Sequence, residues 1–445
     1  MFRFPKNLYT DVRIETVSVT NITLENLELK QNKVKKDQGA FIRIFDGKRW
    51  YYCATTELTN LQREIDNLAR LASPNPEILN HPLLKNLEVN REVNLKYENS
   101  DLSEIENKAK VELLNTYLPI IKAEDQVRMS RMYYLDKHVL KQFFSSRGSE
   151  ITFDSQNCCL AIRYLFQINN VPYQGSEDVF ALDFAGLAGQ EGKIIETMNK
   201  DLEYCKQAVN VVPGTYTCIL SPLTTGVFAH ERFGHKSEAD FMVGDETLKK
   251  EWNLGKKVGA EILNIVDTGL IEGSGYVPFD DEGNRAKKNF LIKDGLLNAR
   301  LHNASTATNL AEAPTGNARA LNFEYEPIVR MTTTYIEKGD QTKEELFADI
   351  EEGIFIDNLN HGSGMTTFTI APRRAYMIRK GEIAEPVRIS CLTGNVMNTL
   401  HEIDGISDQV ELFSFALGGC GKMEQYPLPV AFGGPYIRVR ALQVL

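Results

Sequence analysis

The chain has 445 residues, of which 42% are hydrophobic and 25% are charged, so it is long enough for two or three domains and has the composition of a folded protein. Fifty basic and sixty acidic side chains give a formal charge of −10, which opposes direct binding to nucleic acid or to anionic membranes. We find no signal peptide and no apolar run of membrane-spanning length, and the seven cysteines do not suggest a disulfide framework. We therefore expect a cytoplasmic protein with reduced thiols.

The first half of the chain is predicted to mix strands and helices. Residues 41–45 and 50–53 flank Asp46-Gly47, a turn dipeptide typical of hairpins. A helix is expected next, because apolar residues recur at helical spacing at Leu58, Leu61, Ile65, Leu68 and Ala72. Residues 80–125 are rich in Asn, Glu and Lys, which favours exposed helices and connectors without a chemical role. Residues 126–169 predict antiparallel strands.

A glycine-rich loop at residues 186–192 precedes another predicted helix. Its glycines do not have dinucleotide-binding spacing, so a mobile linker is the favoured interpretation. The apolar face expected for this helix consists of Ile195, Met198, Leu202, Cys205 and Val209.

Residues 211–214, Val-Val-Pro-Gly, break the chain, and we place a domain boundary there. This divides the protein into an amino-terminal mixed α/β domain, residues 1–211, and a β-rich carboxyl-terminal domain, residues 212–445. Ser221 and Pro222 suit the start of a helix in the second domain, and Glu345 completes a capping box for a later helix near Thr342. The expected fold class is α+β.

The residues most informative about chemistry are His230-Glu231-Arg232-Phe233-Gly234-His235. Two imidazoles can bind zinc, and a nearby carboxylate can accept a proton from a zinc-bound water. We interpret His230 and His235 as metal ligands and Glu231 as a general base. The alternative for this hexapeptide alone is an amphipathic helix with solvated histidines.

The spacing of the two histidines creates a geometric requirement. Residues five apart on an ideal α-helix lie about 140° apart, too far round the helix to bind one ion. A π-bulge brings such residues onto one face, so we predict a widened turn or a break around residues 230–235. Gly234 is the residue expected to accept the strain.

Residues 230–241, HERFGHKSEADF, resemble the metal motif of the TldD/PmbA family of zinc metallopeptidases, specifically of its TldD-type subunits. Further segments resemble the family in the same order: Leu301-His302-Asn303, residues 330–336 followed by Gly339-Asp340, and the tail from Gly419 to Arg440. The resemblance covers the chain from about Tyr216 onward. Arg232 and Lys236 depart from the family pattern and would add positive charge near the site.

The resemblance implies a third zinc ligand, Cys420, in a Gly-Cys-Gly-Lys turn. A thiolate between glycines can approach a metal closely, and Lys422 would favour its deprotonated form, although a buried hydrophobic role is the common alternative for a cysteine. Glu238 and Asp240 could orient a ligand imidazole or be exposed helix carboxylates. Cys205, Cys218 and Cys391 are interpreted as core residues, and His302, His361 and His401 as solvated or structural.

The resemblance also implies the activity. We expect a Zn²⁺-dependent peptidase that hydrolyses short or unfolded polypeptides, with an extended chain pairing to a sheet edge. A homodimer or a heterodimer with a related family subunit is expected. Two alternatives are a non-catalytic interaction subunit, of the type proposed to modulate DNA gyrase, and a zinc hydrolase of non-peptide amides.

The predicted site joins segments that are far apart in the sequence. For tetrahedral zinc, the Cys420 sulfur should lie about 3.5 Å from each ligand nitrogen of His230 and His235. Even without metal, the three groups are expected within roughly 5 Å of one another, because the fold positions the carboxyl-terminal turn.

Overall fold

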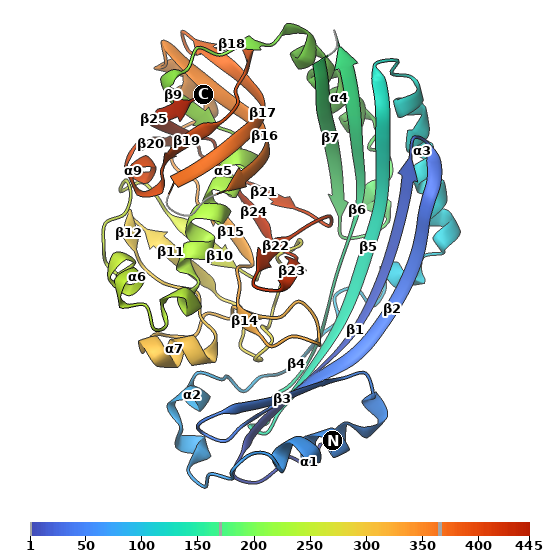
Figure 1. The fold of residues 1–445 in the computed structure, drawn as a ribbon, viewed down its shortest axis with the longest axis vertical. Coiled ribbons are helices and arrows are strands. Elements are labelled where there is room, and N and C mark those ends of the chain that lie inside the picture. Colours follow the sequence, from blue (N-terminus) through green and yellow to red (C-terminus); the bar gives the residue numbers. More distant parts are fainter. Residues whose placement is uncertain (1, 169–170, 364–366) are drawn as a thin grey trace.

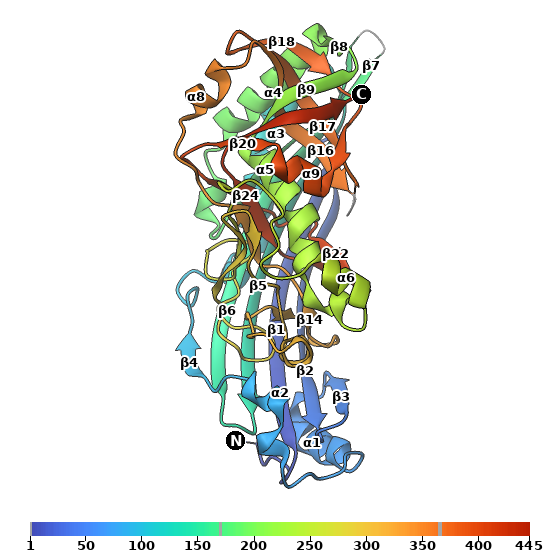
Figure 2. The ribbon, with the colours of Figure 1, turned by 90° about the vertical axis from the view of Figure 1, so that its left-hand side faces the viewer.

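A computed structural model describes residues 2–168, 171–363 and 367–445. A sheet of long strands from the amino-terminal part runs along one side of the molecule, and a β-rich body formed by the later residues lies beside it (Figure 1). The view from the side shows an elongated molecule with the amino terminus near one end (Figure 2). The predicted α+β class is confirmed.

The amino-terminal sheet has the strand order β3-β2-β1-β5-β6-β4, and β7 also pairs with β6. The predicted hairpin is confirmed, because Phe45 pairs with Trp50 across the Asp46-Gly47 turn. Antiparallel pairing of β5 with β6 confirms the strands expected after residue 126. The strands are β1 (Tyr9–Glu25), β2 (Glu28–Phe45), β3 (Trp50–Thr55), β4 (Arg91–Asn94), β5 (Val127–Ser145), β6 (Glu150–Ile168) and β7 (Val171–Ala181).

Helices cover this sheet by burying apolar faces. The helix expected after residue 58 is present as α1, and its Ile65 packs with Ile42 and Ile44 of β2. The exposed helices predicted over residues 80–125 are only partly correct, because α3 buries Leu114 and Tyr117 against the sheet. The helices of this part are η1 (Leu58–Asn60), α1 (Leu61–Ala69), η2 (Ile78–Asn80), α2 (Pro82–Lys85), η3 (Leu102–Glu104), α3 (Asn107–Lys122), η4 (Ala185–Leu187) and α4 (Glu191–Gln207).

The helix after the glycine-rich loop is confirmed as α4, but its buried face is rotated from the predicted one. Ile194 and Tyr204 are buried, whereas Ile195 is exposed. Val209 is exposed and lies beyond the helix in β8 (Val209–Asn210), which pairs with β18 (Glu382–Arg388). The predicted face contains only apolar residues. The buried face also contains Asp201, which a search for apolar spacing does not find.

Five strands of the carboxyl-terminal body close into a small barrel. They follow the order β16-β9-β25-β19-β17, and β16 pairs with β17 to complete the ring. Their ranges, with those of the strands joined to them, are β8 (Val209–Asn210), β9 (Gly214–Leu220), β16 (Glu352–Ser363), β17 (Thr367–Arg379), β18 (Glu382–Arg388), β19 (Leu392–Asn395), β20 (Ile403–Ile406) and β25 (Ile437–Val444).

A second sheet of this body has the order β12-β11-β10-β15-β24-β21. Two short hairpins accompany it, one of β13 and β14 and one of β22 and β23. The ranges are β10 (Ile265–Thr268), β11 (Lys288–Lys293), β12 (Leu296–Leu297), β13 (Ala318–Arg319), β14 (Ile328–Val329), β15 (Thr333–Ile336), β21 (Glu411–Ser414), β22 (Cys420–Lys422), β23 (Gln425–Leu428) and β24 (Ala431–Gly434).

The helix α5 packs between the barrel and the second sheet (Figure 1). A methyl group on Gly226 would lie 2.5 Å from the Gly433 nitrogen, so the glycine allows α5 to contact β24 directly. The capping box predicted at Thr342 and Glu345 is confirmed at α8. The helices of this body are α5 (Pro222–Ala229), η5 (His230–Gly234), η6 (His235–Ser237), η7 (Ala239–Met242), α6 (Glu246–Glu251), α7 (Ala304–Leu310), α8 (Lys343–Ala348) and α9 (Val396–His401).

Buried ion pairs join the sheet to the carboxyl-terminal body. Arg43 of β2 binds Asp11 at 2.8 Å and Glu282 at 3.0 Å, and all three side chains are buried. Lys141 of β5 similarly binds Asp281 at 2.7 Å. Charges removed from water in this way hold two surfaces in one register. The division of the chain between residues 211 and 212 stays a prediction.

Candidate metal centre

The segment that contains both histidines begins as a regular helix and then widens. The Ser221 hydroxyl accepts a hydrogen bond from the Thr224 backbone, and Pro222 occupies the first turn, which confirms the predicted helix start. Residues His230–Gly234 then form a π-helix, η5. This confirms the predicted widened turn. Residues five apart share a face in a π-helix, and the rings of His230 and His235 have centroids 5.3 Å apart.

Gly234 is needed because its lack of a side chain leaves room for a neighbouring residue, and not because its backbone is strained. Its φ of −55° and ψ of −61° are helical values that any residue can adopt, so the predicted strain at this position is wrong. A methyl group at Gly234 would instead lie 1.7 Å from the sulfur of Met331. Glycine therefore allows the widened turn to pack against the buried residue that precedes β15.

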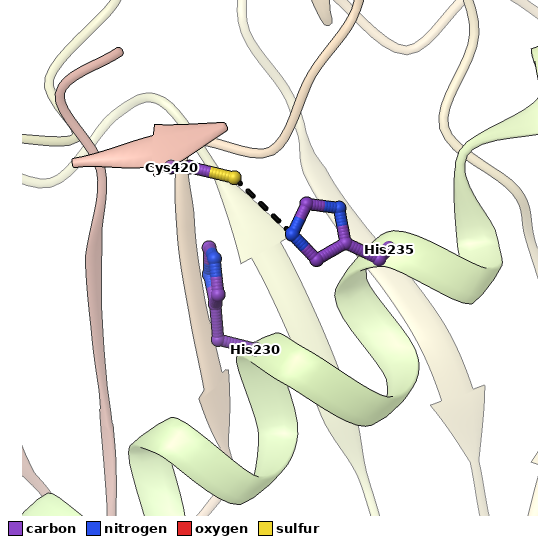
Figure 3. Close-up of side chains that lie close together, drawn as sticks. All are labelled: His230, His235 and Cys420. Carbon is purple, nitrogen blue, oxygen red and sulfur yellow. Dashed lines mark hydrogen bonds between the residues drawn. The ribbon is translucent and has the colours of Figure 1, made fainter. Parts of the chain in front are cut away.

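Cys420, which lies 185 residues after His235, approaches the same point. It begins β22, and its sulfur lies 3.3 Å from His235 Nε2 (Figure 3). One ligand atom from each of His230, His235 and Cys420 lies within 4.8 Å of the others. The prediction that these three groups lie within roughly 5 Å of one another is met.

Two observations indicate that these three residues fit a zinc ion. The separation of 3.3 Å between the Cys420 sulfur and His235 Nε2 is close to the value of about 3.5 Å expected for two ligands of tetrahedral zinc. The Nδ1 atom of His230 is buried and has no hydrogen-bond partner among the described residues. Since a buried imidazole nitrogen is costly to leave unpaired, this atom also favours a site built around a ligand.

Glu238, Lys422 and Asp240 form a connected network behind His235. Glu238 is fully buried and lies 3.2 Å from His235 Nδ1, so a proton on Nδ1 leaves Nε2 free to face the Cys420 sulfur. The Lys422 ammonium lies 3.1 Å from Glu238 and 2.6 Å from Asp240. Because Lys422 is on the same short strand as Cys420, this network ties the hairpin to the turn that holds His235.

Two buried arginines hold the same hairpin through its backbone. Arg330 is fully buried and donates to the carbonyl oxygens of Cys420 at 2.7 Å and Gln425 at 3.1 Å. Arg319 donates to the carbonyl oxygen of Pro429, the residue directly after the hairpin, at 2.7 Å. Arg330 lies in one of the segments that resemble the family, but the sequence predicts no role for either arginine. No local signal identifies them, because their partners are backbone atoms from distant segments.

The environment of Cys420 favours its thiolate. Burial by itself raises the pKa of this thiol, but the hydrogen bonds and charges of His230 and His235 lower the pKa to about 5. Burial also lowers the pKa of His235, and its bonds to Cys420 and Glu238 overcome this effect and raise the pKa to about 10. Without a metal, these opposite shifts favour a thiolate at Cys420 beside a protonated His235.

The three cysteines predicted to be core residues have surroundings different from those of Cys420. Burial raises the pKa of Cys218 and Cys205, which lie in hydrophobic clusters as expected. Cys391 is only half-buried, so its assignment to the core is partly wrong. None of these thiols is grouped with a set of metal-ligating side chains within the described residues.

Glu231, the residue after His230, lines a large cavity. The cavity has a volume of about 1280 Å³ and lies between β7 and α4 on one side and α5, β16, β17, β21 and β24 on the other. Leu223, Val227 and Glu231 recur every four residues, and all three line the cavity. Glu231 is half-buried there, one residue from His230. The three candidate ligands and the cavity are therefore adjacent at this residue.

The other residues considered in the sequence analysis make different contacts, are exposed, or have side chains outside the described residues. Lys236 binds Glu251 at 2.7 Å, and its ammonium lies 4.9 Å from the centre of the Trp252 ring, so a neighbouring carboxylate balances its charge. The side chain of Arg232 lies outside the described residues. His302 is buried against Thr306 and Glu312 and has a structural role, as expected. His361 and His401, also not expected to be ligands, are exposed.

Comparisons with known proteins agree on a family. The model of the PmbA/TldA metallopeptidase C-terminal domain matches residues 213–445, and that of PmbA/TldA metallopeptidase domain 1 matches residues 10–73. A metalloprotease of Synechocystis is 44% identical over 234 residues, covering 52% of this chain and 50% of that protein. A protein of Saccharolobus solfataricus named as a zinc metalloprotease TldD homolog is 29% identical, over 98% of this chain and 96% of its own.

Solved structures share the fold. TldE from Thermococcus kodakarensis superposes with a TM-score of 0.75 and 16% identity, over 98% of this chain and 96% of that one. A structure from Thermotoga maritima has a TM-score of 0.77 and 18% identity, over 98% and 96% of the two chains. At these identities the likeness extends to the fold alone. Among the described residues, no helix is both long enough and apolar enough to cross a membrane.

Proposed function

The chain belongs to the PmbA/TldD family of metallopeptidases, and we propose that it is a zinc-dependent peptidase with His230, His235 and Cys420 as metal ligands and Glu231 as general base. The observation that carries this proposal is the convergence of the three ligand atoms within 4.8 Å beside a cavity wall that includes Glu231. Three protein ligands leave a fourth position open for water or substrate, as in catalytic zinc sites.

The metal, when bound, would supply an activated water and a positive charge for the developing oxyanion. Glu231 accepts the proton of the attacking water and can pass it to the leaving amine. The Glu238 carboxylate fixes the His235 ring through Nδ1, and Lys422 and Asp240 hold Glu238 in turn. Arg330 positions Cys420 by binding its backbone carbonyl.

The cavity suits an extended polypeptide. The strand β21 ends the second sheet among the described residues, and its Glu411 and Phe413 line the cavity. A substrate strand can pair with such an edge through backbone hydrogen bonds, which favours unfolded chains and excludes folded proteins. We further propose a cytoplasmic enzyme that acts as a dimer, either with itself or with a related family subunit; seven free cysteines support a reducing compartment.

Glu231→Gln tests the catalytic assignment. The variant should bind zinc normally, since Glu231 is not proposed as a ligand, and should lose at least roughly a hundredfold in turnover because a general base is removed. Zinc content by metal analysis and kcat on an unstructured peptide measure the two effects. Activity that falls only in proportion to lost zinc contradicts the role of Glu231. Purified protein without zinc and without peptidase activity, even after zinc is added, would favour a non-catalytic subunit.

A further inference from the structure

Arg373 is a buried cation on the cavity wall that has no carboxylate partner within the described part of the chain. Its side chain is 8% exposed, and it lines the same cavity as Glu231. One guanidinium nitrogen donates to the Ser176 hydroxyl of β7, while its Nε is buried without a hydrogen-bond partner. A buried charge is costly unless it is paired, so this guanidinium lacks the anion that its surroundings would normally provide.

The neighbouring Arg374 shows what a paired arginine looks like at this position. It binds Asp201 at 2.5 Å and Asp357 at 2.7 Å, which joins α4 to the barrel. Asp201 also accepts hydrogen bonds from the hydroxyls of Tyr164 and Tyr173. The nearby carboxylates are therefore committed to Arg374 and the tyrosines and do not neutralise Arg373.

The pairing of β16 with β17 is interrupted at Arg373, and this affects where the Arg373 side chain points. Asn358 of β16 pairs with Arg374, and the next residue, Leu359, pairs with Pro372. Arg373 thus faces no residue on the partner strand and is the extra residue of a β-bulge. Such bulges re-aim a side chain and are frequent beside active sites.

Other cations on the cavity wall differ from Arg373 in pairing or in burial, since Arg388 is exposed and donates to the Cys205 carbonyl. Arg163 is paired with Asp178, and Lys193 binds Glu177 at 2.7 Å. Glu231 and Glu411 line the wall formed by η5 and β21, where a carboxylate of the substrate would be repelled. Attraction at Arg373 and repulsion near the metal centre would orient an acidic peptide end away from the reacting bond.

We propose that Arg373 binds a carboxylate of the peptide substrate, and that this contact sets how the peptide enters the cavity. An arginine fork is suited to a carboxylate because it can donate two parallel hydrogen bonds. The carboxylate is either the carboxyl terminus of the peptide or an Asp or Glu side chain. This inference rests on the proposed peptidase function and adds a substrate class to it.

The distance along the wall fits a short peptide. Val227 lies one helical turn, about 6 Å, from Glu231. A methyl group on Gly362 would lie 2.9 Å from Val227 Cγ1, and Gly362 pairs with Ile370 in β17. Arg373 is three residues further along that strand, about 10 Å. With about 5 Å added between the paired strands, these steps make a path of roughly 25 Å along the wall, and the direct separation is shorter, so an extended chain of about six to eight residues can span it.

The test compares peptides that differ only at the carboxylate. A flexible peptide of six to eight residues without Asp or Glu is made as the free acid and as the carboxyl-terminal amide, and a third peptide carries one Glu within the amide. The wild-type enzyme with zinc should favour the free acid over the amide by roughly tenfold to a hundredfold in kcat/KM, the effect of one charge-assisted interaction. Recovery of the preference by the Glu-containing amide identifies a side-chain carboxylate as the ligand.

Variants assign that preference to Arg373. Arg373→Gln should bring the ratio of free acid to amide close to one, and Arg373→Lys should retain part of it. Lys200→Gln is the matched control, since Lys200 lines the same cavity from α4 and is paired with Glu196 at 2.6 Å. The control should keep the wild-type ratio. A wild-type ratio near one, a preference unchanged in Arg373→Gln, or an equal loss in Lys200→Gln overturns the proposal.

A binding measurement separates this proposal from the proposed function. Calorimetric titration of the free acid and the amide into Glu231→Gln protein reports affinity without hydrolysis. Unequal affinities that depend on Arg373, together with no hydrolysis by the wild-type enzyme, leave the carboxylate site standing and contradict the peptidase. Equal affinities together with normal hydrolysis contradict the carboxylate site and leave the peptidase standing.

Discussion

The helical segment of residues 222–235 and the hairpin of β22 and β23 build one candidate centre but are held in place by different interactions. The helix depends on close packing, with Gly226 against Gly433 and Gly234 against Met331. The hairpin depends on buried charges, because Arg330 binds its backbone and Lys422 binds Glu238 and Asp240. The difference indicates that added volume should displace the histidines, whereas removed charge should displace the cysteine.

Removing the cysteine should have the largest effect on metal binding. Cys420→Ala deletes one of the three proposed ligands, so zinc affinity should fall by at least roughly a hundredfold. Competition with a chromophoric chelator measures the dissociation constant. Cys391→Ala, at a half-buried thiol outside the cluster, is the control and should bind zinc as the wild type does. Equal affinities for the two variants would remove the hairpin from the site.

Removing the charge that ties the hairpin to His235 should have the next largest effect. Lys422→Met leaves Glu238 and Asp240 without their cation, and the loss of support behind a ligand typically costs about tenfold to a hundredfold in metal affinity. Lys236→Met is the matched control, because this buried lysine follows His235 directly but pairs with Glu251 instead. If both variants weaken zinc binding equally, general destabilisation rather than hairpin position explains the loss.

Adding volume beneath the helix should destabilise the protein by a smaller amount. Gly226→Ala places a methyl group 2.5 Å from a backbone nitrogen of β24, and such overpacking costs about 1–3 kcal/mol in the free energy of unfolding. Gly192→Ala in α4 is the control, since no atom lies within 4 Å of its added methyl group. That variant should be neutral or more stable by up to about 1 kcal/mol. Urea denaturation of both variants decides whether packing holds the helix.

The smallest effect is a shift in the titration of the metal-free protein. Because the pKa of Cys420 is lowered to about 5, its thiolate should persist from neutral pH down to about pH 5 and be lost below it. The ultraviolet absorbance of the thiolate, taken as the difference between wild type and Cys420→Ala, follows this loss. Glu238→Gln removes a carboxylate that favours the protonated form of His235, so the midpoint should move upward. A midpoint near that of a free thiol would show that the histidines do not approach the cysteine.

Local sequence determined much of the helical half of this site. Ser221 and Pro222 specify the helix start, and two histidines five residues apart require the widened turn that η5 provides. The turn dipeptide Asp46-Gly47 between residues 41–45 and 50–53 likewise predicts the hairpin. These features depend on neighbours in the chain, so periodicity and spacing are sufficient to find them.

Tertiary structure alone decided the rest. The family resemblance predicts Cys420, but only the structure brings it to His235, because no spacing rule connects residues 185 positions apart. The sequence suggests backbone strain at Gly234. It does not reveal the close approach of Met331, because this is a contact between distant segments. The sequence does not reveal the roles of Arg330 and Arg373. Arg330 is distinguished by the backbone carbonyl that it binds, and Arg373 by the lack of a carboxylate partner among the described residues, and both features depend on the fold. Burial and pairing of charge are properties of the packed molecule, and only the packed molecule reveals them.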